Sequence, residues 1–284
     1  MESNQGRIMG YAIKKSCGLT YLDFHSEKSE TIIFIHGNSH SKMSFSHQMR
    51  EPKFSSYRLI LVDLPGHGDS DSLAEYSLNE LGEVMASFIE SLELKNFIIV
   101  GHSLGGHVAT QLLKSVSPKA LALYGTPPLK KPLSMEGFLP NPLTAPLALE
   151  HSDINNLRLL ADEFGYKNQD KEIFIEDYSK TDIKFRSTIF GSVFQGEYTD
   201  ERNLLSEFSG KVLGIVCARD GIVNSSYIRS EYSELGFKII DIDSGHCPHV
   251  EIAEQFNTIL SMFAEDVFQK EQYNFNDEEI LSYE

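Results

Sequence analysis

The stretch FIIVGHSLGGHVAT, residues Phe97–Thr110, decides the fold. Its first four residues are apolar and suit a buried strand, and a helical pattern follows the glycines. Ser103 stands between the two, inside the pattern Gly-x-Ser-x-Gly that begins at Gly101 and ends at Gly105. A turn this tight holds a serine in strained backbone dihedrals and presents its hydroxyl at the carboxyl edge of a sheet. The stretch therefore predicts a nucleophilic serine, provided that the chain also supplies a base, an acid and oxyanion donors.

Strand-like runs recur on both sides of this stretch. Six of them are apolar on both faces: Thr31–Gly37, Tyr57–Gly66, Lys95–Gly101, Lys119–Gly125, Lys211–Ala218 and Phe237–Ile242. Such runs suit a parallel sheet that is covered by helices. Helical patterns fall between them, and residues 77–94 carry one apolar stripe at helical spacing. The alternation predicts an α/β fold with a doubly wound, mostly parallel sheet, preceded by an antiparallel ribbon over residues 6–25.

One segment interrupts the alternation of strands and helices. Residues 127–200 open with a proline-rich stretch, contain no good strand and then become helical. We therefore predict a helical cap, residues 127–200, inserted into an α/β core of residues 1–126 and 201–268. Residues 269–284 are acidic and are expected to form a frayed tail.

Composition and charge restrict the class of partner. The chain has 284 residues, of which 41% are hydrophobic, and a formal net charge of −16. This charge argues against a nucleic-acid partner and suits a small neutral substrate better than an anionic one. No signal peptide or membrane-spanning run is evident. The three cysteines, Cys17, Cys217 and Cys247, are widely spaced, which predicts a cytoplasmic protein with no disulfide, metal site or cofactor.

The base is expected after the last strand, where the chain reads DIDSGHCPHVE. His246 follows a Ser-Gly turn there, and His249 is the competitor, expected at a helix start and turned away from the sheet edge. The acid is expected between serine and histidine in the chain. Asp220, just past a strand, is the candidate, because Asp243 is too close to His246 along one strand end.

Oxyanion donors are expected from two backbone segments. The N–H of Leu104 begins the helix after Ser103, and the N–H of Asn38 lies in the loop after the first parallel strand. The Asn38 side chain is a further candidate for substrate contact. Five histidine and aspartate residues are expected to be structural: His36, Asp63, His67, His102 and His107.

At this point the chain resembles the α/β-hydrolase superfamily, through the motifs HGN, DLPGHGDS, GHSLGG, ARDGIV and GHCPHVE. The resemblance implies a triad of Ser103, Asp220 and His246 beneath a cap. Within that superfamily, HGNSHS, DLPGHGDS, SLGGHVA and YGTPPL look like the N-acylhomoserine lactonases of this fold.

These observations predict a serine hydrolase of carboxylic esters, small acyl lactones among them. The alternatives are a general short-chain carboxylesterase or thioesterase, and a ligand receptor with negligible turnover. The cap is expected to form the acyl pocket, and the candidates are Phe138, Leu139, Phe164, Tyr166, Phe174, Phe185, Phe190 and Phe194. Tyr166 and Tyr178 are candidates for a polar side chain that holds the hydroxyl of an opened lactone away from the acyl-serine.

Overall fold

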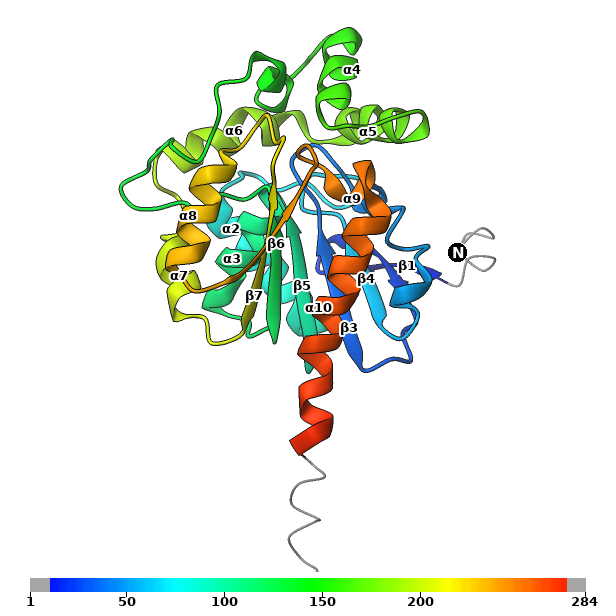
Figure 1. Cartoon of the computed structure of the whole chain (residues 1–284). Coiled ribbons are helices and arrows are strands. Elements are labelled where there is room, and N and C mark those ends of the chain that lie inside the picture. The colour runs from blue at the N-terminus through cyan, green and yellow to red at the C-terminus, as the bar shows by residue number, and fades with distance from the viewer. Residues whose placement is uncertain (1–10, 275–284) are drawn as a thin grey trace, which may run out of the picture.

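A computed structural model of the chain describes residues 11–274. Its centre is an eight-stranded sheet in the order β1-β2-β4-β3-β5-β6-β7-β8 (Figure 1). The first two strands form the expected antiparallel ribbon, and β2 also pairs antiparallel with β4. All other pairs are parallel. The strands are β1 (Tyr11–Ser16), β2 (Leu19–Phe24), β3 (Glu30–Ile35), β4 (Arg58–Val62), β5 (Asn96–His102), β6 (Ala120–Tyr124), β7 (Lys211–Cys217) and β8 (Lys238–Ile242).

Alternate residues of the central strands supply two separate cores. Ile33, Ile35 and Ile99 pack on one face with residues of α2 and α3, whereas Phe34 and Val100 pack on the other face with residues of α10. Because successive side chains of a strand point to opposite faces, a strand that is apolar throughout needs helices on both sides. This is the doubly wound arrangement predicted from the sequence.

The helices of the core follow the strands in turn. Figure 1 shows α2, α3 and α8 on one side of the sheet and α10 on the other. Ser77 caps α2 by accepting a hydrogen bond from the Glu80 N–H. The core helices are η1 (Lys42–Phe45), η2 (Pro52–Phe54), α2 (Leu78–Ser91), α3 (Leu104–Gln111), η3 (Leu112–Lys114), α7 (Glu201–Glu207), α8 (Ser225–Glu234), α9 (Pro248–Glu251) and α10 (Ala253–Asn274).

The segment between β6 and α7, which the sequence predicted to be a cap and which is called the cap below, is helical. It holds η4 (Pro142–Leu147), α4 (Ile154–Glu163), α5 (Gln169–Lys180) and α6 (Ile183–Phe194), which Figure 1 shows together at one end of the sheet. The described part of the tail continues α10 as far as Asn274, so residues 269–274 are helical rather than frayed. Residues 275–284 lie outside the described residues.

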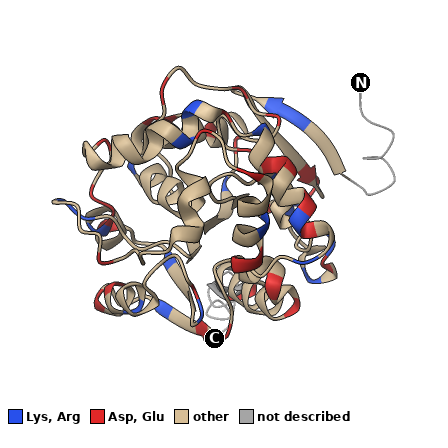
Figure 2. Cartoon of the chain, turned by 90° about the horizontal axis from the view of Figure 1, so that it is seen from above, with Lys and Arg blue, Asp and Glu red and all other residues tan. Residues whose placement is uncertain are grey.

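Within residues 11–274, no helix has both the length and the apolar character needed to cross a membrane. Seen from above, Lys and Arg are interspersed with Asp and Glu around the outside of the molecule (Figure 2).

Candidate active site

Ser103 occupies a strained turn between β5 and α3. Its φ of 51° and ψ of −117° lie outside the ordinary regions for a residue with a side chain. The flanking glycines are required by close packing. A Cβ on Gly101 would lie 2.6 Å from Gly106 Cα, and one on Gly105 would lie 2.1 Å from the Ile35 carbonyl oxygen. The turn can therefore form only where both positions lack a side chain, which explains the Gly-x-Ser-x-Gly pattern.

His246 and Asp220 meet at the ends of neighbouring strands. His246 follows β8, and its Nδ1 lies 2.8 Å from Asp220 Oδ2. The other carboxylate oxygen of Asp220 accepts from the N–H groups of Ile222 at 2.9 Å and Val223 at 3.0 Å. The ring therefore donates its Nδ1–H and leaves Nε2 available. Asp243, the competing acid, pairs instead with an exposed arginine, Arg219, and its own side chain is 84% exposed.

Gly125 leaves room for the His246 imidazole beside the turn that carries Ser103. It follows β6, the neighbour of β5, and lines the same cavity as Ser103. A Cβ on Gly125 would lie 2.7 Å from His246 Cε1, so only glycine leaves room for the ring. Ser103 Oγ forms no hydrogen bond with His246 in this structure. Such bonds commonly tighten only when a substrate binds.

The two expected oxyanion donors flank Ser103 in the cavity wall. Leu104 is the first residue of α3, so its N–H has no acceptor within the helix. Asn38 lies just beyond β3, and a Cβ on Gly37 beside it would lie 3.4 Å from Ser103 Cβ. The Asn38 side chain is held in place by two hydrogen bonds: its Nδ2 donates to the Leu147 carbonyl at 3.0 Å and its Oδ1 accepts from Ser39 Oγ at 2.9 Å, which leaves the second amide hydrogen for a substrate.

A cavity of about 330 Å³ opens in front of Ser103. This volume falls within the range of about 300–1,000 Å³ that small-molecule sites occupy. Its wall is mostly apolar and combines the core with the cap. The cap contributes Leu129, Leu133, Met135, Phe138, Leu139, Thr144, Ala145, Leu147, Ala148, Ile189, Phe190, Val193 and Phe194.

Residues 32–258 match the model of the alpha/beta hydrolase family. The chain belongs to this family. A Mycoplasma genitalium protein named "Putative esterase/lipase 2" is 25% identical over 269 residues, which cover 87% of this chain and 93% of that protein.

Solved structures of alpha/beta hydrolases resemble the whole fold. A mutant of the N-acyl homoserine lactonase AidH complexed with N-hexanoyl homoserine lactone has a TM-score of 0.78 at 22% identity, covering 91% of this chain and 98% of that one. An esterase from Exiguobacterium antarcticum has a TM-score of 0.72 at 17% identity, covering 90% and 96%.

The cap of this alpha/beta hydrolase divides its aromatic residues between the cavity and the packing beneath it. Of the residues predicted for the acyl pocket, Phe138, Leu139, Phe190 and Phe194 line the cavity. Phe174 and Phe185 are buried in the packing.

Three further cap residues that were expected to contact the substrate do not line the cavity either. Phe164 stacks on the His246 ring, with centroids 5.8 Å apart. The Tyr166 hydroxyl lies 2.8 Å from His40 Nε2. The Tyr178 hydroxyl donates to the Pro146 carbonyl at 3.1 Å. All three hold the cap together or onto the core, a role that uses the same kind of side chain as a pocket wall.

The DLPGHGDS loop has a structural role, as predicted for Asp63 and His67. Asp63 accepts hydrogen bonds from Lys42 Nζ at 2.6 Å and from the Asp69 N–H at 2.9 Å. His67 Nε2 accepts from the Ser39 N–H at 3.3 Å, and burial lowers the pKa of His67 to about 3. The neutral ring thus braces the loop that carries Asn38.

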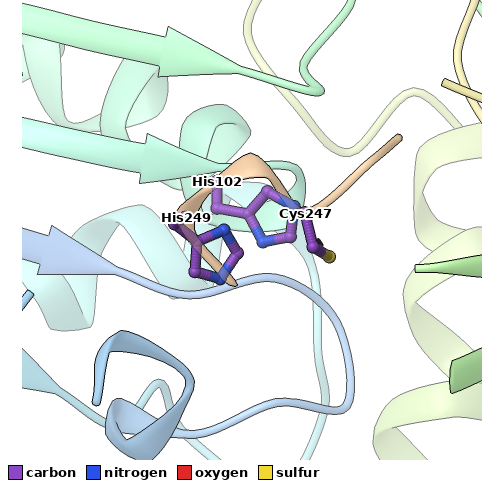
Figure 3. Close-up of side chains that lie close together, drawn as sticks. All are labelled: His102, Cys247 and His249. Carbon is purple, nitrogen blue, oxygen red and sulfur yellow. Dashed lines mark hydrogen bonds between the residues drawn. The ribbon is translucent and has the colours of Figure 1, made fainter. Parts of the chain in front are cut away.

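Three potential metal ligands lie close together next to the turn that carries Ser103, a cluster that the sequence did not predict. Figure 3 shows His102, Cys247 and His249 side by side, with their ligand atoms within 4.8 Å of one another. His102 Nε2 lies 3.1 Å from the His246 carbonyl, so this nitrogen carries a hydrogen and does not bind a cation, whereas His102 Nδ1 has no hydrogen-bond partner among the described residues. Ligands of one zinc ion at bonds of about 2.0–2.3 Å would also lie closer together. Burial lowers the pKa of both histidines well below the usual value, which fits neutral packing residues.

Proposed function

We propose that this protein is a serine hydrolase that cleaves small acyl lactones, N-acylhomoserine lactones among them, through an acyl-enzyme. The observation that carries the proposal is one arrangement. A strained serine lies in the wall of a mostly apolar 330 Å³ cavity, and a buried histidine–aspartate pair lies at the same carboxyl edge of the sheet.

The chemistry follows from the hydrogen bonds of the pair. Ser103 Oγ attacks the carbonyl carbon while His246 Nε2 accepts its proton. Asp220 holds Nδ1–H and stabilises the imidazolium that forms. The N–H groups of Asn38 and Leu104 bind the developing oxyanion, and each such donor is worth about 3–4 kcal/mol. The proton passes from His246 to the leaving oxygen, and water activated by the same ring then releases the acid.

A lactone places one additional demand on this site. Its alkoxide stays tethered after ring opening, so the hydroxyl must be held away from the acyl-serine while water attacks. The hydroxyls of Tyr166 and Tyr178, considered for this task from the sequence, are both engaged within the packing. The polar atoms that the cavity offers instead belong to Asn38, Thr144 and His107.

The lactone proposal is supported by the sequence motifs and by the shape of the site. The wall offers far more carbon than polar surface, as a fatty acyl chain requires, and the matched lactonase structures hold acyl homoserine compounds of four to six acyl carbons. The second candidate is a general short-chain carboxylesterase or thioesterase, because the same residues would cleave linear esters.

A competition experiment separates these candidates. Purified protein is given N-hexanoyl homoserine lactone and ethyl hexanoate in equal amounts, and both products are followed by mass spectrometry. The lactonase proposal predicts ring opening at least as fast as ester cleavage. Turnover of the ester without ring opening of the lactone would leave the carboxylesterase, and turnover of neither compound would favour a receptor.

A further inference from the structure

His107 brings an imidazole into the wall of the cavity that holds Ser103. It lies on α3, four residues after Ser103, and both residues line the same cavity. Its surroundings in the wall are apolar and include Leu78, Leu129 and Val193. A polar ring in such a place is either satisfied by the protein or available to a ligand.

A buried carboxylate determines which nitrogen of His107 carries the hydrogen. Glu201 Oε2 lies 2.8 Å from His107 Nδ1, and the Glu201 side chain is 1% exposed. The same carboxylate accepts from the Leu129 N–H at 2.9 Å, and Gln111 Nε2 lies 3.4 Å from its other oxygen. Since an ionised carboxylate only accepts, Nδ1 of the ring is the donor and Nε2 of the neutral ring keeps its lone pair.

That lone pair is available to a ligand. Within residues 11–274, His107 Nε2 has no hydrogen-bond partner, and it is not sealed from solvent. The ring cannot turn to satisfy it without breaking the bond to Glu201. The cavity therefore presents one oriented acceptor close to Ser103.

We propose that His107, oriented by Glu201, is a specificity-determining residue that accepts a hydrogen bond from an N–H or O–H group of the substrate. This inference rests on the proposed hydrolase function and narrows its substrate class. The preferred acyl ester or lactone carries such a donor a few bonds from the scissile carbonyl, because His107 and Ser103 line one small cavity. A substrate without the donor leaves a desolvated acceptor unpaired, which is unfavourable.

The test uses two p-nitrophenyl esters that differ only in this donor. One is the ester of N-acetyl-β-alanine, and the other is its N-methyl amide counterpart, which lacks the N–H. Each kcat/KM is divided by the rate of hydrolysis of that ester in hydroxide, so that intrinsic reactivity cancels. The wild type is expected to favour the N–H ester about tenfold. His107→Phe should lower this ratio to near one, and the exposed control His151→Phe should keep it.

Three outcomes decide the matter. A wild-type ratio near one overturns the inference, whether or not His107→Phe folds. A folded His107→Phe protein that keeps the tenfold ratio overturns it as well. p-Nitrophenyl hexanoate, which has no donor, tests the proposed function separately, because wild-type protein that fails to cleave any of the three esters is not an esterase.

Discussion

Replacing Gly125 with alanine is expected to disable the site while leaving the fold intact. The new methyl would lie 2.7 Å from His246 Cε1 and 3.1 Å from Nδ1. Carbon atoms in contact lie about 3.5–4.0 Å apart, so the ring must move by roughly 0.8 Å or more. Asp220 holds the same ring at 2.8 Å, and a shift of that size strains this bond and turns Nε2 away from Ser103.

The loss of rate follows from that displacement. A misplacement of about 1 Å in a catalytic group costs about 100-fold, so we expect kcat/KM to fall by about that factor. The free energy of unfolding should fall only modestly. Gly125 has a φ of 62°, which costs a residue with a Cβ about 1–2 kcal/mol.

A matched glycine separates the two effects. Gly236 has a φ of 73°, and among the described residues no atom lies within 4 Å of the position that an alanine methyl would occupy there. Gly236→Ala should therefore lose a similar stability and keep wild-type activity. The assay is the initial rate on p-nitrophenyl hexanoate together with the melting temperature of each variant. If Gly125→Ala retained more than a third of the activity of Gly236→Ala, the placement of the imidazole beside Gly125 would be wrong.

Three further results are expected. His246→Ala should lower kcat/KM by about 10⁴-fold or more. His249→Ala removes a fully buried ring, so it should lower the melting temperature while kcat/KM falls much less than in His246→Ala. If His249→Ala had the larger effect on kcat/KM, His249 would be the base. Phe138→Ala and Phe190→Ala each enlarge the cavity, so the preferred acyl length should increase across a series of p-nitrophenyl esters. An unchanged acyl-length preference in both variants would show that these residues do not contact the acyl chain. Burial raises the pKa of Asp177 from 3.8 to about 7, so the folded chain keeps a proton that the unfolded chain releases, and stability falls as the pH rises through this window. Asp177→Asn should therefore raise the melting temperature relative to wild type at pH 8 but not at pH 4, and equal differences at both would contradict this.

Most of the sheet could be predicted from the sequence. Each parallel strand matches its predicted run, with β3 and β5 each extending one residue beyond it, because a central strand buried on both faces must be apolar throughout. The helices α4, α5 and α6 lie in the part of residues 127–200 that was predicted to be helical. The break at Ile252, which separates α9 from α10, could not be predicted because no proline or glycine lies at that position.

The site was predicted less evenly. Ser103, Asp220 and His246 follow strand ends in an order that the fold imposes, so their neighbourhood could be anticipated. The cap residues could not be sorted, because an apolar stripe shows that a face is buried and not whether protein or cavity covers it. His107 was expected to be a packing or surface residue, since its partner Glu201 lies 94 positions further along the chain.

The most direct test of the account is the hydrolysis rate of Ser103→Ala. The variant removes only the hydroxyl, so its circular dichroism spectrum and melting temperature should match those of the wild type. The account predicts that kcat/KM for both p-nitrophenyl hexanoate and N-hexanoyl homoserine lactone falls by about 10⁴- to 10⁶-fold. Retention of more than a tenth of the wild-type rate on either substrate by the folded variant would contradict it.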